Sequence, residues 1–393
     1  MRAGYNLPSQ KETELMEFIT AFLGYVLPFI LVLSVLVFVH EFGHYLVARL
    51  CGVKIEVFSI GFGREIFGIN DKAGTRWKFS IIPLGGYVRM FGDADASSRP
   101  KEGLGALSDA EKAVTFQFKP LWQRFAVVAA GPVTNFLFAI VVLAVLFMAV
   151  GRPFTAPKVG AVREGSAAAV AGIEPGDTVR AIGGTSIRRF EQIQQIIAIN
   201  LGTSVAIMVE RGGRTIDLKA TPEVVEFKDN FGNSHSKGLL GISSSHTMEV
   251  EKMGPFSAIA ASVSETFSMS RDILVTLRQL IVGERSSSEI GGPLQIAKLS
   301  GDFAKNGIVS LIWFMAVLSI NLGLLNFFPI PLLDGGHLFF YLCEGILRRP
   351  LSDKAQEIGF RIGFGLVMLL LVFATWNDLV SLRVVDFIKR LAS

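Results

Sequence analysis

Residues 22–44 read FLGYVLPFILVLSVLVFVHEFGH, an apolar stretch that ends in the motif HEFGH at residues 40–44. About 20 apolar residues are needed to cross a bilayer core of roughly 30 Å as a helix. Residues four apart share one face of a helix, so the imidazoles of His40 and His44 can bind one Zn²⁺. Glu41, between them, can act as a general base. The stretch predicts a metal site inside or at the edge of a membrane helix, where costly ionisable groups indicate function.

The composition is that of a membrane protein. Half of the 393 residues are hydrophobic and 18% are charged, and the mean hydropathy is +0.48. The net charge of +4 is modest, and the sequence has no basic patch that would indicate nucleic-acid binding. We therefore expect no nucleic-acid partner. The predicted spans are residues 22–39, 125–151, 306–333 and 362–377. The fourth covers only about 24 Å, because Asp378 is expected to end it.

Basic residues orient these spans. Lysines and arginines are frequent between the first and second spans, and three more lie between residues 348 and 354. The positive-inside rule places both segments on the cytoplasmic side, and residues 152–305 and both termini outside. Residues 1–17 carry mixed charge and no small-residue cleavage site follows, so we expect no cleavable signal peptide. The two cysteines, Cys51 and Cys343, imply no disulfide framework.

Other segments show their own periodicity. Residues 54–90 alternate and carry glycine pairs, which predicts hairpins. Residues 156–222 predict a compact α/β module. Its expected strands are 158–162, 178–182, 204–210 and 214–220, and its expected helix is 190–200. Residues 107–119 predict a short helix. Residues 255–281 predict an amphipathic helix that lies at the membrane surface or on the catalytic core.

A catalytic zinc site has three protein ligands and one open position. Asp334 is the candidate for the third ligand, since it ends an uncharged run. Pro329 and Pro331 must break the helix before it, and broken backbone at membrane depth is tolerated only in a protein interior or a cavity. His337 is expected to support the site structurally rather than to bind the metal.

Two amides lie in the second and third spans, Asn135 and Asn326. Each can hydrogen-bond between helices, or donate to the substrate backbone or a developing oxyanion. Asn326 is the better functional candidate, because it is eight residues before Asp334.

HEFGH in the first span, GPVTN at 131–135 and NFFPIPLLDGGH at 326–337 resemble the site-2 protease family of intramembrane zinc metalloproteases, in its bacterial branch. GGPLQIA at 291–297 looks like the same branch. Residues 165–177, GSAAAVAGIEPGD, resemble a PDZ domain, which binds peptides by strand addition or limits access by its bulk. In the family, the region matching residues 54–90 forms a membrane-associated β-hairpin near the active site.

The resemblance implies a polytopic α-helical membrane protein of about four transmembrane helices, with a β-hairpin region and one inserted α/β PDZ domain. Substrate strands would pair along the hairpin around Gly61, Gly63, Gly85 and Gly86. The predicted segments are an N-terminal extension 1–17, spans 18–50, 120–151, 306–337 and 362–393 (the last with the C-terminal tail), the hairpin and loop region 51–119, the PDZ domain 152–245, an amphipathic helix with connector 246–305, and a cytoplasmic loop 338–361.

The predicted function is an intramembrane zinc metalloendopeptidase of the bacterial inner membrane. One Zn²⁺ on His40, His44 and Asp334 would activate water, and Glu41 would take its proton and return it to the leaving amine. The resemblance implies single-span membrane substrates, such as anti-sigma factors or remnant signal peptides, and a possible peptide tail at a periplasmic PDZ domain. The alternative is a non-catalytic membrane scaffold that holds exported proteins on the PDZ domain.

Overall fold

The computed structural model describes residues 10–93, 106–200, 202–228, 234–245, 248–282 and 291–381. The chain divides into two compact units. The first, here the helical unit, comprises Met1–Ala144, Ile259–Leu280 and Arg285–Ser393. The second, here the inserted module, comprises Val145–Ala258 and Ile281–Glu284. The predicted class, a helical membrane protein with an inserted α/β module, is confirmed at this level.

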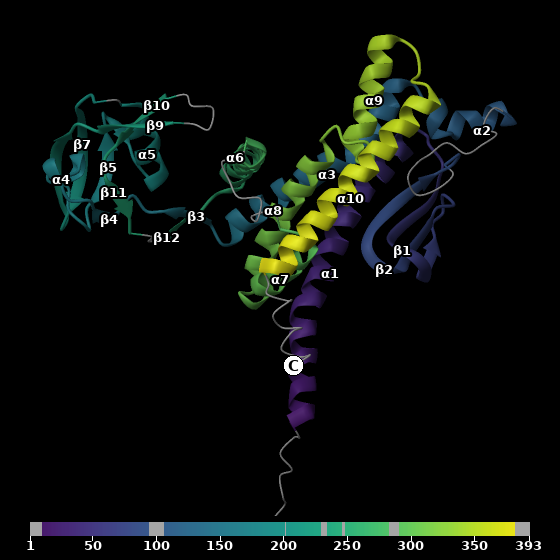
Figure 1. Ribbon diagram of the computed structural model, residues 1–393, viewed down its shortest axis with the longest axis horizontal. Helices are drawn as coiled ribbons and strands as arrows, with labels where there is room; N and C mark the ends of the chain where they lie inside the picture. The colour runs from purple at the N-terminus through teal and green to yellow at the C-terminus, as the bar shows by residue number, and fades with distance from the viewer. Residues whose placement is uncertain are drawn as a thin grey trace, which may run out of the picture. The chain divides into compact units, whose positions relative to one another are not determined.

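Four helices of the described chain are long and apolar enough to cross a membrane (Figure 1). They are α1 (Gln10–Leu50), α3 (Leu121–Ala149), α8 (Ile308–Asn326) and α10 (Asp353–Ser381). Helix α1 begins within the predicted extension 1–17, because residues 10–17 are mostly strong helix formers such as Gln, Lys, Glu, Leu and Met. Residues 1–9, and the predicted tail from residue 382 onward, lie outside the described residues.

Helix α10 continues past Asp378, where the predicted fourth span ended, so that limit was wrong. The Asp378 carboxylate is fully buried. It accepts backbone N–H bonds from Gly292 (2.8 Å), Leu294 (2.9 Å) and Gln295 (3.1 Å) at the start of α7 (Pro293–Lys305). A carboxylate at a helix N-terminus satisfies orphan N–H groups and complements the helix dipole. Asp378, which interrupts the apolar pattern of α10, therefore caps the N-terminus of α7.

Substituting Asp378→Ala should lower the free energy of unfolding by about 2–4 kcal/mol. Hydrogen bonds to charged groups contribute about 1.5–3 kcal/mol each, and three bonds to one carboxylate are not additive. Thermal unfolding of the detergent-solubilised protein measures the loss. Thr375→Ala, which removes a hydroxyl bonded to Leu371 on an exposed part of the same helix, is the matched control. An Asp378→Ala protein as stable as the control would contradict the capping role.

The predicted break after α8 is confirmed, but the predicted loop 338–361 was wrong over most of its length, because α9 (Asp334–Leu347) covers its first part and α10 begins at Asp353. Helix α8 ends at Asn326, and α9 starts at the candidate ligand. The pair Gly335-Gly336 concealed this helix, because glycine disfavours helix interiors. Here both glycines lie in the first turn, where an added Cβ on either would overlap the carbonyl groups of the preceding loop. The loop can fold back onto α9 only because these side chains are absent.

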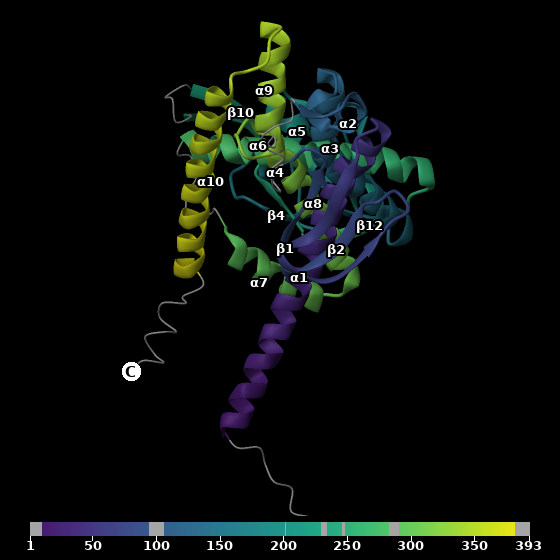
Figure 2. The same ribbon diagram turned by 90° about the vertical axis from the view of Figure 1, so that its right-hand side faces the viewer.

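The predicted hairpin is confirmed as β1 (Ile55–Asn70) and β2 (Arg76–Met90), which lie against α1 (Figures 1 and 2). Both strands bend sharply. Ser59 has Tyr87 as its partner on one side and Lys78 on the other. Gly61 and Gly63, with φ of +90° and +87°, bend β1 rather than end it, as only glycine does without strain. Among the described residues, 86–90 pair on one side alone, so they form an open edge.

The smaller helices of the described chain agree with the predicted periodicity. Residues 107–119 contain α2 (Asp109–Val114) and the 3₁₀ turn η2 (Phe116–Phe118). The amphipathic segment is α6 (Pro255–Val282). The connector that follows it falls largely on residues 283–290, outside the described residues.

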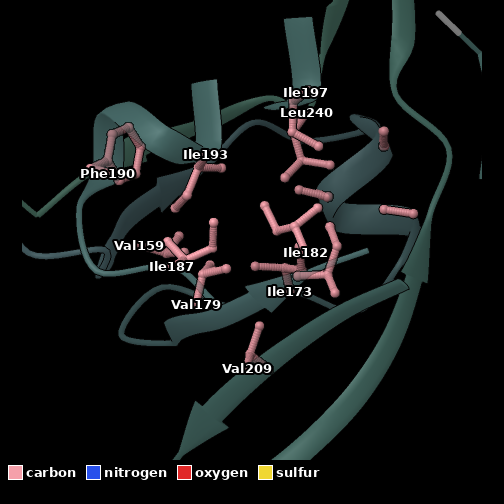
Figure 3. Close-up of a cluster of buried hydrophobic side chains, with 14 residues drawn as sticks. Val159, Ile173, Val179, Ile182, Ile187, Phe190, Ile193, Ile197, Val209 and Leu240 are labelled. Carbon is pink, nitrogen blue, oxygen red and sulfur yellow. The ribbon is translucent and has the colours of Figure 1, made fainter. Parts of the chain in front are cut away.

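The predicted strands and helix of the inserted module are confirmed. A four-stranded sheet has the order β6 (Thr185–Ser186), β5 (Thr178–Ile182), β7 (Val205–Arg211) and β8 (Arg214–Ala220). Helix α5 (Phe190–Ile199) packs its apolar face on the module's core. Figure 3 shows Phe190, Ile193 and Ile197 of α5 facing Val179 and Ile182 of β5. Burying each such side chain stabilises the fold by about 1.5–3 kcal/mol. The other elements are β3 (Arg152–Thr155), β4 (Val159–Val162), α4 (Ala167–Val170), β9 (Glu223–Lys228), β10 (Ser234–Leu239), β11 (Ile242–Ser244) and β12 (Met248–Glu251).

The module extends beyond the predicted boundary at residue 245, since β12 pairs with β3. Its loop before β5 is anchored by Asp177 and Arg211, joined by two bonds of 2.7 Å. Burial by itself would raise the pKa of Asp177, but the Arg211 guanidinium and the Glu174 N–H outweigh it and hold that pKa below its usual range.

Candidate metal centre

Helix α1 brings two imidazoles together. His40 and His44 are one helical turn apart, and their Nε2 atoms are 3.2 Å from each other. Both are largely buried, on a helix that is apolar enough to span a membrane. The two nitrogens thus meet at one point, as the sequence spacing predicted.

Asp334 reaches this point from a distant part of the chain. Its Oδ2 lies 3.0 Å from His40 Nε2 and 3.5 Å from His44 Nε2. The loop before it places Leu332 at φ +106°, a conformation that costs a non-glycine residue about 1–3 kcal/mol. Such strain persists only where the surroundings impose it, so the loop that delivers Asp334 is held by its packing.

Helix α3 forms the wall behind the two imidazoles. His44 Nδ1 lies 2.9 Å from the Val127 carbonyl oxygen. His40 Nδ1 lies 3.0 Å from the side-chain amide of Asn135, which is fully buried. Between these contacts an added Cβ on Gly131 would overlap His44 and come within 2.8 Å of His40 Cε1. The absence of a side chain at this position lets α3 touch both rings.

A cavity of about 240 Å³ opens beside the three donor atoms. Its walls include Glu41, Asn326 and His337, together with apolar groups. The apolar residues are Val88, Met90, Phe116, Val127, Val128, Leu332, Leu333 and Phe360, and the rings of Tyr87 and Tyr341 line the cavity as well. The candidate metal ligands, the candidate base Glu41 and the candidate amide donor Asn326 therefore all line the same cavity.

The open sheet edge also borders this cavity. Gly86, Val88 and Met90 of this edge line the cavity together with Glu41. A Cβ added to Gly86 would lie 3.3 Å from Glu41 Cγ and closer still to Val37 Cγ1, at 2.7 Å. The absence of a side chain at Gly86 therefore lets the strand lie close to α1.

The structure brings most of the predicted site residues together. Gly61, Gly63 and Gly85 are not among the cavity-lining residues, and Gly85 packs on Phe62 instead. Asn135 is behind His40 rather than at the cavity wall. Sequence reasoning missed Val127, Val88 and the packing role of Gly131. Val127 contacts His44 through its backbone carbonyl, and no sequence pattern reveals such a contact. Gly131 could have been noticed, because it precedes a proline in an apolar run.

Helix α10 supports the loop that carries Asp334. A Cβ added to Gly363 would overlap the Pro331 carbonyl, and Phe360 lines the cavity one turn earlier. We expect Gly363→Ala to displace the loop and lower metal affinity about 10-fold or more, the range typical of disturbed ligand supports. Metal content after dialysis against a graded chelator series measures this.

Gly365→Ala is the matched control, because a Cβ there meets nothing within 4 Å. Both changes raise helix propensity equally. Equal metal affinity in the two variants would show that α10 does not position the loop.

The chain belongs to peptidase family M50, whose model matches residues 28–370. An Agrobacterium fabrum protein provisionally named a zinc metalloprotease is 48% identical over 92% of this chain and 98% of its own length. A similarly named Rhizobium meliloti protein is 44% identical over 91% and 97%. Metalloprotease MmpA of Caulobacter vibrioides is 39% identical over 93% and 98%. A solved PDZ domain of an SdrC-like protein from Listeria monocytogenes covers 23% of this chain and 88% of its own, at 18% identity and a TM-score of 0.18. The predicted family membership is confirmed.

Proposed function

We propose that the chain is a zinc-dependent endopeptidase that hydrolyses peptide bonds within the membrane-spanning segments of single-span proteins. The convergence of His40, His44 and Asp334 beside Glu41 carries this proposal. The histidines lie on an apolar helix, where ionisable groups are costly and mark function. The metalloprotease names of its relatives support the same activity.

Zinc fits the donors that the chain offers. Zinc bonds to nitrogen and oxygen are about 2.0–2.2 Å long, so tetrahedral ligand atoms lie about 3.3–3.6 Å apart. The Nε2 atoms of His40 and His44 and the Oδ2 of Asp334 are 3.0–3.5 Å apart. A zinc ion held by these three residues would keep one position open for water and would supply a Lewis acid that lowers the pKa of that water to about 7. We assign one zinc ion per chain to these residues.

Glu41 is placed to move the proton. It borders the same cavity as the donor atoms, so it can take a proton from the attacking water and return it to the leaving amine. Asn326 lines that cavity as well, and its amide N–H can donate to the substrate carbonyl as negative charge develops there.

The open sheet edge fits an unwound substrate. Peptide bonds in a helix are bonded internally, so a substrate helix must unwind before attack. An extended segment can then pair its main chain with residues 86–90, which end beside Glu41. Of the four glycines predicted to lie where the substrate strand pairs, we assign this role to Gly86 and its neighbour Gly85. Gly61 and Gly63 instead bend β1 through their positive φ angles.

The inserted module offers a second place for peptide. A groove lies between α5 and residues 238–242, with Phe190, Ile193 and Ile197 on its helical side. In the described chain, β11 pairs with β4 alone, so its other edge is open toward strand addition. We assign the module a PDZ-type role, in which it holds an exported tail or limits access to the protease by its bulk.

The topology follows from charge. We place α1, α3, α8 and α10 across the bacterial inner membrane, residues 51–119 and 348–354 on the cytoplasmic side, and the inserted module in the periplasm. The metal centre then faces the cytoplasmic side.

Reconstitution tests the proposal. Purified protein in liposomes is mixed with single-span test proteins whose exported domains have been trimmed, and mass spectrometry locates the cuts. We expect cuts within the apolar segment, their loss with a metal chelator, and recovery with Zn²⁺. Cuts confined to segments outside the bilayer would refute intramembrane proteolysis. Tail capture without any cleavage would favour the scaffold alternative.

A further inference from the structure

We infer that Asn135 holds His40 in its metal-binding tautomer by accepting a hydrogen bond from the His40 Nδ1–H. Asn135 is then a positioning residue of the metal centre and not a donor to substrate. The inference rests on the zinc site proposed above.

The two imidazoles meet Asp334 through the same nitrogen. Their Nε2 atoms face Oδ2, at 3.0 Å for His40 and 3.5 Å for His44. A neutral imidazole that binds a metal through Nε2 carries its proton on Nδ1, and that N–H needs an acceptor. For His44 the acceptor is the Val127 carbonyl, which can only accept. His40 faces a side chain instead.

Asn135, the partner of His40, can turn either the oxygen or the nitrogen of its side-chain amide toward the imidazole. Asn135 Nδ2 lies 3.0 Å from His40 Nδ1, and its Oδ1 has no hydrogen-bond partner among the described residues. A half-turn about the Cβ–Cγ bond exchanges the two ends and leaves the number of hydrogen bonds unchanged. Once Nε2 is committed to a metal, only the oxygen-facing orientation makes a bond to Nδ1–H. Metal binding therefore selects that orientation.

The position of Asn135 does not suit an oxyanion donor. It is fully buried, and it is not among the residues that line the cavity. Its backbone carbonyl accepts a bond from Ser319 Oγ at 2.8 Å, which ties this turn of α3 to α8. Asn326 does line the cavity, so the donor role falls there.

Zinc affinity of the purified holoprotein tests the inference by chelator competition. Asn135→Leu keeps the side-chain size and removes the acceptor, and we expect a 10- to 100-fold weaker affinity, as for lost partners of ligating histidines. Asn135→Asp keeps an acceptor but has no N–H, and we expect an affinity within about threefold of wild type. Asn135→Ala repeats the acceptor loss with less steric risk, should the leucine variant fail to fold.

Ser319→Ala is the control for helix packing, because it touches the Asn135 backbone and not His40. Its zinc affinity should match wild type even where its thermal stability falls. Wild-type affinity in both Asn135→Leu and Asn135→Ala would overturn the inference and leave the zinc protease standing. So would an Asn135→Asp protein that binds zinc normally yet loses more than about 100-fold in kcat, because an N–H would then be needed. A wild-type protein that binds no zinc would refute the proposed function itself.

Discussion

Replacing Glu41 by glutamine is expected to slow cleavage of a membrane-spanning substrate by about 100- to 10,000-fold, the range for loss of a general acid–base group. Glutamine keeps the shape of the side chain and cannot accept the proton. The metal donors His40, His44 and Asp334 are untouched, so zinc content should stay at one ion per chain. Single-turnover cleavage in liposomes, with parallel metal analysis, separates the two effects.

Glu56→Gln is the control carboxylate. Glu56 lies on β1, in an ion pair with Arg89 at 3.1 Å, and is partly exposed to solvent. Exposed pairs contribute about 0–1 kcal/mol, so this change should leave cleavage unaltered. Cleavage at the wild-type rate by the Glu41→Gln protein would remove Glu41 from the mechanism.

Adding one methyl group at Gly131 is expected to abolish tight zinc binding, although every candidate ligand remains. The new Cβ would overlap His44 and press on His40 Cε1, and the α3 backbone behind it cannot yield as a flexible side chain does. We expect zinc affinity to fall by at least about 100-fold, the upper end of the range for disturbed ligand surroundings. Proteolysis should fall with it.

Gly24→Ala is the control for helix propensity, since a Cβ there meets nothing within 4 Å. In a helix the exchange of glycine for alanine by itself stabilises by about 1 kcal/mol. A loss of zinc at Gly131→Ala alone therefore reports the steric contact. Unchanged zinc affinity would mean that α3 does not pack on the imidazoles as described.

Local patterns in the sequence predicted the site's core. The spacing of His40 and His44 needs only helical geometry, and Asp334 was marked by the prolines before it. The strands of the inserted module followed from alternation and glycine turns, with 178–182 and 214–220 confirmed residue for residue. In each case neighbours in sequence determine the structure.

Features that depend on distant partners were not predictable in this way. Asp378 interrupted the hydropathy of α10, and only the N–H groups at the start of α7, which bond to its carboxylate, explain how the helix continues through it. Helix α9 was hidden by two glycines that its preceding loop requires. Asn135 was predicted from the sequence as a donor to substrate or as an interhelical hydrogen-bond partner, and the choice between substrate and histidine depends on how α1 packs on α3.

The Asp378 carboxylate also bears on how the protein is made. With α10 placed across the bilayer as proposed above, an acidic residue within it costs up to about 2.5–3.5 kcal/mol for insertion at the bilayer centre, so we expect α10 to insert less favourably by itself than its apolar residues suggest. Its partner, the start of α7, precedes it in the chain and has left the ribosome first. Synthesis order would thus supply the compensating N–H groups before Asp378 is made, and a circular permutant that placed α10 ahead of α7 would insert α10 without that help.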